Sequence, residues 1–331
     1  MGDIQQVLAI LSKAIIRETA AFNYYYKQSE DKSLTPDLAG LLTRLAEEER
    51  VHRRLLMNEY MSIEKGWNES WSEEKGTVLA YPVPDKPPIR VLEVSPCLEA
   101  RAIALPSLLV GGDNILTLVL KDGKKGVAGT FISLYDVMGH GLKTTGINAF
   151  ANKVLGEYID SAGPSGMETE LLFPRNVIKH LNRRMNERFE GQGVFLTMVT
   201  ALFHTAAREM TYAIAGHEPP FVIRKDGKVE SLMNTQLVVG IDAEYPYRQA
   251  TTPFDPGDVF CVFSDGIIEA KNPAGDMFGR ERISDLLKGS AGKAPDRIIQ
   301  DLLDRLREFA GGTPLDDEMT IVIVAAKGEK E

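Results

Sequence analysis

Two aspartates at the ends of predicted neighbouring strands could bind a metal ion together. Asp113 immediately precedes the strand-like run NILTLVL, and Asp136 immediately follows GTFISLY. The intervening KDGKKG is typical of a turn, so we expect the two strands to form an antiparallel hairpin. The start of the first strand and the end of the second then lie at one edge of the sheet, where Asp113 and Asp136 should meet.

Two further aspartates have equivalent places near the C-terminus. Asp265 follows VFCVFS, and Asp317 lies just before the run TIVIVAA. If these strands are antiparallel neighbours, their aspartates also share an edge, and four carboxylates could converge. Two like charges about 4 Å apart repel by about 4 kcal/mol at an effective dielectric constant of about 20. Because no Lys or Arg directly flanks any of the four aspartates, we expect a bound cation to offset this repulsion.

The type of ligand indicates which cations these are. Carboxylate oxygens suit hard divalent ions such as Mg²⁺ or Mn²⁺, whereas zinc prefers nitrogen and sulfur. Two such ions bridged by one aspartate would lower the pKa of a shared water and supply hydroxide for in-line attack on phosphorus. The expected chemistry is phosphomonoester hydrolysis. Any single Asp-Gly, such as Asp265-Gly266, is more often a turn, so the prediction depends on all four motifs occurring together.

The elements that position these residues follow from hydrophobic periodicity. Residues 3–30 and 36–62 have helical spacing, and Thr35 and Pro36 suit the start of the second helix. Beyond a proline-rich linker, strand-like runs alternate with helical stretches near 141–160, 174–189 and 295–310. We therefore expect an α+β chain with antiparallel sheets and outer helices. The expected division is a helical hairpin at 1–62, a linker at 63–88 and a larger domain at 89–327.

Composition excludes several other classes of protein. A net charge of -9 over 331 residues and the lack of a basic tract argue against a nucleic-acid partner. No apolar run approaches the roughly 18 to 20 residues needed to span a membrane. Cys97 and Cys261 lie far apart, and we expect both to be reduced thiols in a cytoplasmic protein.

Residues 98–326 resemble the metal-dependent protein phosphatases of the PPM family, in the bacterial branch of the sporulation and stress-response phosphatases SpoIIE and RsbU. The motifs that carry the resemblance occur in the family's order: ALPSLLVGGD, YDVMGHGLKTT, FLTMVTALFHT, MTYAIAGHEPPFVI, VFCVFSDGIIEAKNPAGDMFGRERI and DDEMTIVIV. The resemblance implies a PPM-type αββα sandwich, with two Mn²⁺ or Mg²⁺ ions between two central antiparallel sheets.

The resemblance also assigns roles to individual residues. Asp136 resembles the bridging ligand, and Val137 would contribute its backbone carbonyl. Asp265 and Asp317 resemble ligands of one ion, and Asp113 resembles a ligand of the other. Of the adjacent aspartates at 316 and 317, the second fits the family's terminal Asp-x-Met-Thr pattern better.

Other residues near these motifs have less certain roles. Tyr135 replaces the glycine usual before the bridging aspartate, and no acidic residue follows Asp113 closely, so metal affinity could differ from that of relatives. His140 could act as general acid for the leaving serine oxygen, or could serve only loop structure. His217 is expected to fix a turn between strands, with a role in the site as the alternative. Glu269 resembles a family residue that lies beside the metals without binding them.

The N-terminal hairpin contains a second group of possible ligands. Glu18, Glu49 and His52 interrupt the apolar stripes of the two helices, and Glu49-x-x-His52 matches the motif of ferritin-like di-iron bundles. The segments ETAAFNYYY and EERVHRRLL resemble the rubrerythrin branch of that superfamily. Because one hairpin holds half a site, a homodimer would complete a di-iron centre on its symmetry axis. Alternatively, the glutamates form a solvated face and the hairpin only dimerises. Tyr25 could hydrogen-bond a ligand or belong to the core.

The resulting hypothesis is a regulated serine/threonine phosphatase. In the branch that the chain resembles, the substrate is a small anti-sigma-factor antagonist of the STAS type, and an N-terminal module senses a signal. Iron, oxygen or peroxide at the hairpin would bias the dimer between states. Two alternatives stay open: an iron-binding ferroxidase or redox sensor whose larger domain is a non-catalytic binding module, and a pseudo-phosphatase that binds phosphoproteins without hydrolysing them.

Overall fold

Two long antiparallel helices form the N-terminal part of the chain. The computed structural model describes residues 2–29, 31, 33–64, 83–84, 88–105, 112–121, 127–138, 142–162, 170–190 and 192–328. Helix α1 spans Gly2–Ser29 and α2 spans Pro36–Glu64, which confirms the predicted hairpin. The Thr35 hydroxyl accepts a long hydrogen bond, 3.4 Å, from the backbone N–H of Leu38 at the start of α2.

Two sheets form the centre of the larger part. Sheet A has the order β1-β2-β12-β11-β7-β8, and sheet B has the order β10-β6-β5-β4-β3. All neighbours are antiparallel except β9, which pairs parallel with β6. The strands of sheet A are β1 Arg90–Val91, β2 Leu98–Leu105, β7 Phe221–Ile223, β8 Val229–Ser231, β11 Val259–Phe263 and β12 Met319–Ala326. Those of sheet B are β3 Asp113–Lys121, β4 Val127–Val137, β5 Leu196–His204, β6 Glu209–Ala215, β9 Thr235–Gln236 and β10 Ala250–Pro253.

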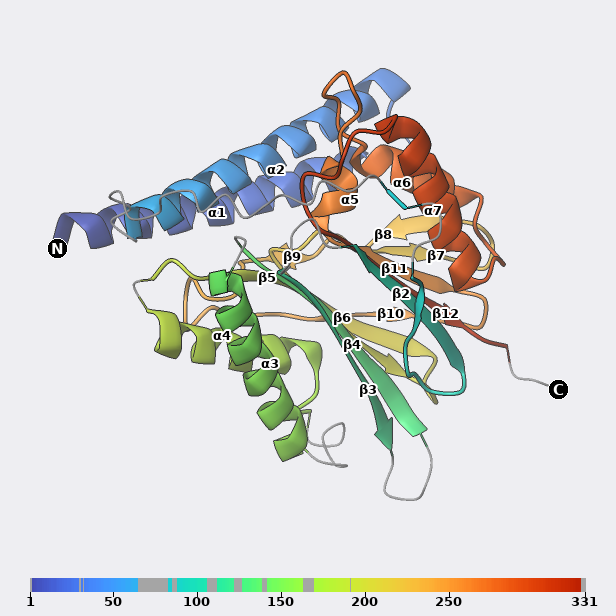
Figure 1. Ribbon diagram of the computed structural model, residues 1–331, viewed down its shortest axis with the longest axis horizontal. Helices are drawn as coiled ribbons and strands as arrows, with labels where there is room; N and C mark the ends of the chain where they lie inside the picture. Colours follow the sequence, from blue (N-terminus) through green and yellow to red (C-terminus); the bar gives the residue numbers. More distant parts are fainter. Residues whose placement is uncertain are drawn as a thin grey trace.

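Helices cover the outer face of each sheet (Figure 1). Helices α3 (Leu142–Ala162) and α4 (Pro174–Phe189) pack on sheet B, whereas α5 (Asp265–Glu269), α6 (Gly279–Lys288) and α7 (Pro295–Ala310) pack on sheet A. A third apolar cluster fills the space between the sheets. This is the expected αββα sandwich of α+β class, and α3, α4 and α7 confirm the three predicted helical stretches.

Alternation along the strands decides which side chains face the neighbouring sheet. In β4, Phe131 and Tyr135 pack outward against the helices, whereas Ile132 and Leu134 pack between the sheets. In β12, Val322 and Val324 likewise point to the interior. Because side chains alternate with a period of two, every second residue beyond these also lies on the inner face.

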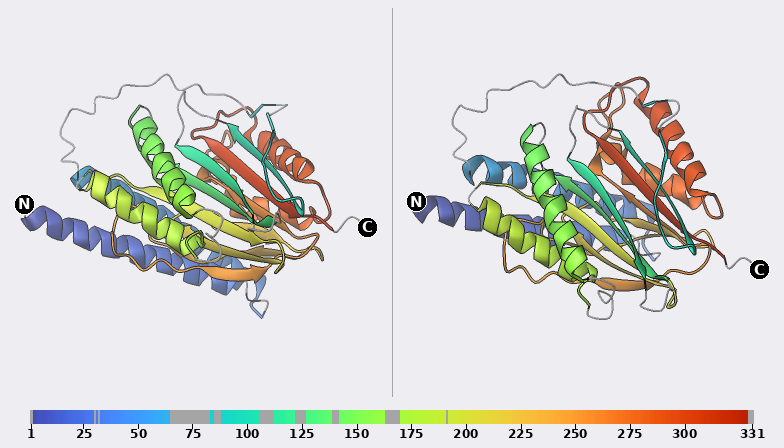
Figure 2. Two further views of the ribbon diagram at one scale, coloured as in Figure 1. Left: turned by 90° about the horizontal axis from the view of Figure 1, so that it is seen from below. Right: turned by 60° about the horizontal axis from the view of Figure 1, so that its bottom comes forward.

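The helical hairpin lies along one end of the sandwich (Figures 1 and 2). Ile15 of α1 and Met57 of α2 are buried against Phe195, Leu237 and Val238. In α1, the side-chain amide of Asn23 donates a 3.0 Å hydrogen bond to the backbone carbonyl of Thr235. The face of the hairpin that carries these side chains is therefore used to cover the end of sheet B.

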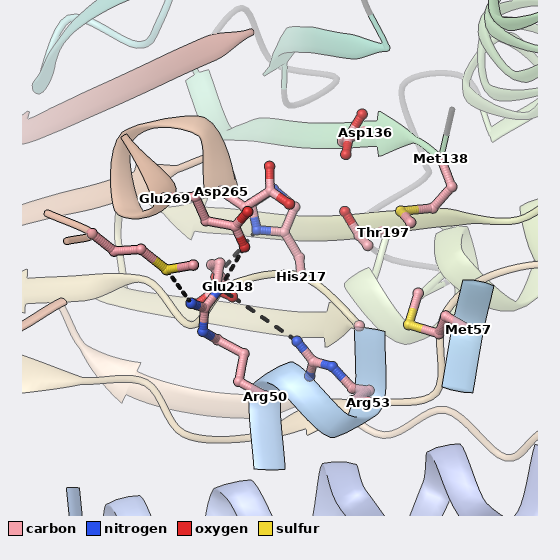
Figure 3. Close-up of a pocket in the computed structure, with 12 residues that line it drawn as sticks. Arg50, Arg53, Met57, Asp136, Met138, Thr197, His217, Glu218, Asp265 and Glu269 are labelled. Carbon is pink, nitrogen blue, oxygen red and sulfur yellow. Dashed lines mark hydrogen bonds and ion pairs between the residues drawn. The ribbon is translucent and has the colours of Figure 1, made fainter. Parts of the chain in front are cut away.

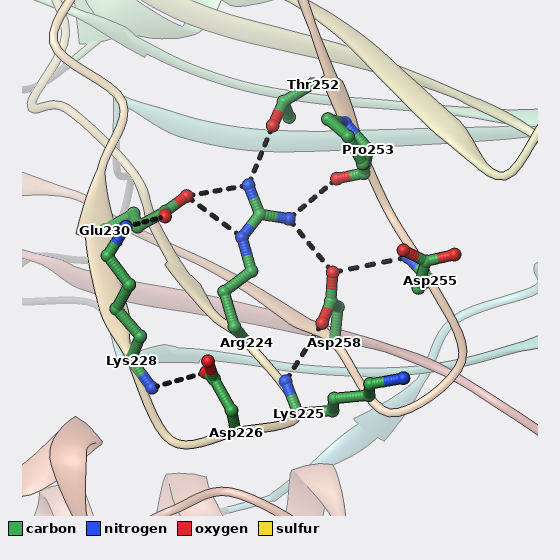
Figure 4. A network of polar contacts seen from close by, with 9 residues as sticks. All are labelled: Arg224, Lys225, Asp226, Lys228, Glu230, Thr252, Pro253, Asp255 and Asp258. Atoms are coloured by element: carbon green, nitrogen blue, oxygen red, sulfur yellow. Dashed lines mark hydrogen bonds and ion pairs between the residues drawn. The ribbon is translucent and has the colours of Figure 1, made fainter.

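A half-buried arginine joins the far edges of the two sheets. Arg224, which follows β7, contacts Glu230 at 2.7 Å, Asp258 at 2.9 Å and the Thr252 hydroxyl at 2.7 Å, and it donates to the Pro253 carbonyl at 2.7 Å (Figure 4). These partners belong to β8, to the turn before β11, and to β10 of sheet B. The network therefore connects the two sheets away from the hairpin.

The structure describes the linker in part, and it also describes both cysteines. Most of the expected linker at 63–88 lies outside the described residues, although Val83 is buried against the core of sheet A. Cys97 and Cys261 are both free thiols. Within the described parts of the chain, the helices are too short or too polar to cross a membrane.

Candidate metal centre

Two of the four predicted aspartates, Asp113 and Asp136, come together at the edge where the two sheets meet near α5. Asp113 pairs directly with Asp136 across β3 and β4. Asp136 has the same parity as Ile132 and Leu134, so both aspartates lie on the inner face of sheet B. In sheet A, β11 pairs with β12, and Asp265 begins α5 directly after β11. The turn-based prediction for Asp113 and Asp136 thus corresponds to the geometry of the sheet.

Three carboxylates come close enough to share a metal ion. Ligand oxygens of Asp113, Asp136 and Glu318 all lie within 4.8 Å of one another. One oxygen of Glu318 accepts hydrogen bonds from the backbone N–H groups of Asp113, at 2.9 Å, and Gly112. This glutamate therefore joins the start of β12 in sheet A to the start of β3 in sheet B.

Glu318 was not predicted from the sequence, because only the structure shows which face of β12 is directed toward sheet B. It has the parity of Val322 and Val324, which places it on the inner face, whereas Asp317 is exposed. The Asp317 carboxylate accepts a 2.8 Å hydrogen bond from the backbone N–H of Glu318, and a ligand role for it stays a prediction. Asp316 is turned outward and pairs with Lys271 at 2.7 Å.

Burial makes this cluster a poor place for uncompensated charge. The pKa of Asp113 is well above its ordinary value, first because burial disfavours the ionised form and second because Glu318 is close. Burial likewise raises the pKa of Asp136, and the charges of Asp113 and Asp265 add to the effect. Neither carboxylate oxygen of Asp113 accepts a hydrogen bond of normal geometry from another described residue. Buried oxygen donors in this state fit a hard divalent cation.

Gly112 leaves space beside these donors. A Cβ atom at this position would lie 2.5 Å from Asp136 Oδ1, 2.6 Å from the Val137 carbonyl oxygen and 3.0 Å from Glu318 Oε1. The three oxygens therefore surround a single small volume that only glycine leaves open. The Val137 carbonyl oxygen lies beside the same volume as the carboxylates, and its ligand role stays a prediction.

A cavity of about 130 Å³ opens beside the cluster (Figure 3). Asp136 and Asp265 line it from the sandwich, together with His217, Glu218 and Glu269. Arg50 and Arg53 line it from α2. The hairpin therefore forms one wall of the cavity, a position that was not predicted from the sequence.

The remaining predicted residues have definite places where the structure describes them. Glu269 accepts a 2.8 Å hydrogen bond from Arg50, and it thereby connects the sandwich to helix α2 of the hairpin. His217 is buried, its Nδ1 lies 3.1 Å from the carbonyl oxygen of Glu218, and burial lowers its pKa to about 4. His140 lies outside the described residues, and its role as general acid stays a prediction.

The second predicted ligand group forms within a single hairpin. Ligand atoms of Glu18, Glu49 and His52 lie within 4.8 Å of one another. His52 Nδ1 is 3.2 Å from Glu49 and 3.9 Å from Glu18. The hydrogen bond between the two glutamates raises the pKa of Glu18 and lowers that of Glu49, as expected for carboxyl groups that share one proton. Tyr25 packs edge-on against Tyr24, with ring centroids 5.6 Å apart, and its predicted hydrogen bond to a ligand stays untested.

The layers of the sandwich and the acidic edge between its sheets define the PP2C-type phosphatase fold. The SiaA-PP2C domain of Pseudomonas aeruginosa matches with a TM-score of 0.59 and 21% identity, over 68% of this chain and 85% of that one. The RsbU and RsbW domains of Rv1364c from Mycobacterium tuberculosis match with a TM-score of 0.58 and 21% identity, over 73% and 63% of the two chains.

Sequence comparison then gives the family. The profile described as "Stage II sporulation protein E (SpoIIE)" matches residues 127–327, and this chain belongs to that family. Phosphoserine phosphatase RsbU of Bacillus subtilis (strain 168) is 26% identical over 234 residues, which are 70% of this chain and 64% of that relative. Protein IcfG of Synechocystis is 24% identical over 149 residues, or 45% and 23% of the two chains. The chain thus spans less than two thirds of either relative. The rubrerythrin profile matches residues 9–93.

Proposed function

We propose that this chain is a metal-dependent protein serine/threonine phosphatase that hydrolyses phosphoserine or phosphothreonine monoesters. The observation that carries the proposal is the convergence of Asp113, Asp136 and Glu318 on one small volume beside an open cavity. Membership of the SpoIIE family and the similarity to a phosphoserine phosphatase support the same conclusion.

The proposed mechanism divides the work between the ions and the chain. Asp113, Asp136, Glu318 and the Val137 carbonyl would hold Mn²⁺ or Mg²⁺, with Asp265 and Asp317 as further candidate ligands at the rim. When bound, two such ions supply a metal-activated water for in-line attack on phosphorus. The chain itself fixes the ligand oxygens through strand pairing and through the backbone hydrogen bonds to Glu318. It also removes those oxygens from bulk water, which strengthens their interaction with cations.

Substitution of the carboxylates tests this proposal. Asp136→Asn or Asp265→Asn should lower Mn²⁺-dependent hydrolysis of an aryl phosphate by about 100-fold or more, because even residues that only orient metal ligands contribute up to that much. Asp316→Asn is the matched control, since Asp316 is exposed and paired with Lys271. Full activity in a folded Asp136→Asn protein would contradict the proposal, and a wild-type chain that binds phosphoprotein without turnover would identify a pseudo-phosphatase.

We further propose that the natural substrate is an anti-sigma-factor antagonist of the STAS type. The support is the similarity to RsbU of Bacillus subtilis, which is named a phosphoserine phosphatase. A phosphorylated STAS protein should be dephosphorylated with a higher kcat/KM than free phosphoserine or an unrelated phosphopeptide. Equal rates on all three substrates would remove the support for this substrate class.

The hairpin cluster favours a second function, iron binding, as a regulatory site or as the principal activity. Glu18, Glu49 and His52 are already close within one chain. Several large apolar side chains of the hairpin are exposed, including Ile10 and Tyr24, each 60% accessible, and they could bind a second copy. Glu49→Ala should remove Fe²⁺ binding and any oxygen consumption, whereas the neighbouring exposed Glu48→Ala should not. Absence of bound iron in the wild-type protein would end this alternative, and sedimentation tests the homodimer.

A further inference from the structure

The cavity beside the candidate metal centre obtains its positive charge from the hairpin. Among the described residues that line it, the sandwich contributes the carboxylates of Asp136, Asp265, Glu218 and Glu269. Its His217 is uncharged near neutral pH because burial lowers the pKa to about 4. The cationic side chains of this lining are Arg50 and Arg53, and both belong to α2.

These two guanidinium groups are buried and held in place. Their side chains are only 6% and 8% exposed. Arg50 donates to Glu269 at 2.8 Å and lies 3.7 Å from Glu218, while Arg53 lies 3.9 Å from the same Glu218 oxygen. Both distances to Glu218 exceed normal hydrogen-bond length. The guanidinium carbon of Arg53 lies over the ring of Phe22, 5.7 Å from the ring centroid.

Three guanidinium groups converge on the carboxylate of Glu218. The other oxygen of Glu218 lies 3.4 Å from Arg280 of α6, so one carboxylate serves three guanidinium groups. Burial alone would raise the pKa of Glu218, yet these arginines lower it. Glu218 and Glu269 together therefore orient the arginine side chains at the wall of the cavity.

We propose that Arg50 and Arg53 bind the phosphoryl group of the substrate, so that the hairpin forms the phosphate-binding wall of the pocket. This inference rests on the proposed phosphatase function. A phosphate monoester carries two negative charges and needs donors on the side away from the metal ligands. The planar guanidinium fork matches phosphate oxygens in geometry and charge. In Figure 3, Arg50 and Arg53 reach from α2 toward the carboxylates of Asp265, Glu269 and Glu218, across the space that Asp136 borders.

The rest of the lining suits a phosphate attached to a protein. Met57, Met138 and Met277 line the same cavity. Methionine side chains are unbranched and flexible, and they adapt to the shape of a polypeptide segment. The expected ligand is therefore a phosphorylated side chain on a protein surface, with its phosphoryl group between the arginines and the metal ligands.

Direct binding of inorganic phosphate tests the inference without requiring turnover. Calorimetric titration of the full chain with phosphate in the presence of Mg²⁺ should give about 10-fold weaker binding for Arg53→Gln and Arg50→Gln, because each removes a charge-assisted hydrogen bond. Arg17→Gln, which alters an exposed arginine of α1, should bind within twofold of the wild type. In steady-state assays on a phosphopeptide, the arginine variants should raise KM more than they lower kcat.

The outcomes separate this inference from the proposed function. Unchanged phosphate affinity in both variants, or no phosphate binding by the wild type, overturns the role of the arginines even if hydrolysis is normal. Arginine-dependent phosphate binding by a chain that hydrolyses nothing supports the inference and contradicts only the phosphatase proposal. If Arg53→Gln does not fold, Arg53→Lys keeps the charge without the fork and should bind phosphate several-fold more weakly. Weakened Mg²⁺ binding in the variants, measured separately, would show a purely structural role and would also overturn it.

Discussion

At the scale of single residues, Gly112 leaves no room for a side chain in the candidate metal centre. It lies beside two candidate carboxylate ligands and the Val137 carbonyl, and its own N–H donates to Glu318. Gly112→Ala should displace these oxygens and weaken Mn²⁺ binding by at least 10-fold, measured by titration. Gly146→Ala is the control, because a Cβ there meets no atom within 4 Å and alanine favours helix α3. Equal metal affinity in the two variants would contradict the assigned geometry.

His217 should make folding stability depend on pH. Its pKa falls from 6.5 to about 4 on folding because the buried imidazole resists protonation. Below pH 6.5 the unfolded chain therefore binds a proton that the folded chain does not bind until about pH 4. As the pH is lowered from 6.5 to 4, the free energy of unfolding decreases by up to about 3 kcal/mol. Urea unfolding of His217→Gln at pH 7.5 and pH 4.5 should show a smaller difference than the wild type. Identical pH dependence would argue against a neutral His217.

The site residues differ in how far the sequence could predict them. Asp113 and Asp136 followed from a turn sequence between two strands, since hairpin pairing fixes which ends meet. Glu318 could not be assigned in this way, because β12 is buried on both faces and its sequence does not show which parity faces sheet B. The arginines of the pocket lie 60 or more residues before Asp113 and are brought to it only by tertiary packing.

At the scale of elements, the short helix α5 connects the metal centre to the hairpin. It begins at Asp265 and ends at Glu269, one helical turn later, and Glu269 binds Arg50. Gly266 allows this helix to touch the backbone carbonyl of Glu318, because a Cβ there would overlap that oxygen. Movement of α5 would therefore displace a candidate ligand and the Arg50 contact together.

The Arg224 network provides a stability prediction that is independent of the site. None of its partners lines the cavity beside Asp136. Arg224→Ala leaves the buried Asp258 carboxylate without its partner and should lower the free energy of unfolding by about 3 kcal/mol in urea titrations, with Mn²⁺ affinity unchanged. Arg305→Ala removes an exposed pair with Glu308 and should cost less than about 0.5 kcal/mol. Equal losses would mean that the network adds no more than a surface ion pair.

Periodicity predicted the long elements and missed the short ones. Helices α3, α4 and α7 have two or more turns of apolar spacing, which a sequence pattern can reveal. Strands β1 and β9 have two residues each, and α5 has five, which is too few for any period to be recognised. Helix α6 follows the loop that contains Gly275 and was likewise not predicted.

At the scale of the whole molecule, divalent ions should stabilise the fold. Buried carboxylates with raised pKa values disfavour the folded state near neutral pH, where they must ionise, and a bound cation removes this cost. Mg²⁺ at about 100 times its dissociation constant should add about 2.7 kcal/mol to the free energy of unfolding. The gain should be lost in Asp136→Asn and retained in Asp316→Asn, as measured by thermal melts. A rise in the melting temperature that is equal in all three proteins would indicate nonspecific binding.

The position of the hairpin could not be predicted from the sequence. Its apolar stripes indicated a partner for the helices, and a second copy was one way to supply it. In the structure, Ile15 and Met57 pack against the sandwich of the same chain, while other apolar residues stay exposed. A second copy of the chain and the sandwich of the same chain would both bind an apolar helix face, so helical periodicity cannot distinguish between them.

Helix α2 carries two pairs of residues with i, i+3 spacing, Glu49 with His52 and Arg50 with Arg53, offset by one residue. One residue corresponds to about 100° around a helix, so the first pair faces α1 while the second faces the pocket. Rotation of α2 about its axis would therefore move the Glu49 and His52 pair and both guanidinium groups in the same motion. A ligand at the hairpin cluster and a ligand in the pocket would then both depend on the orientation of helix α2, without a chain of intermediate residues between the two sites.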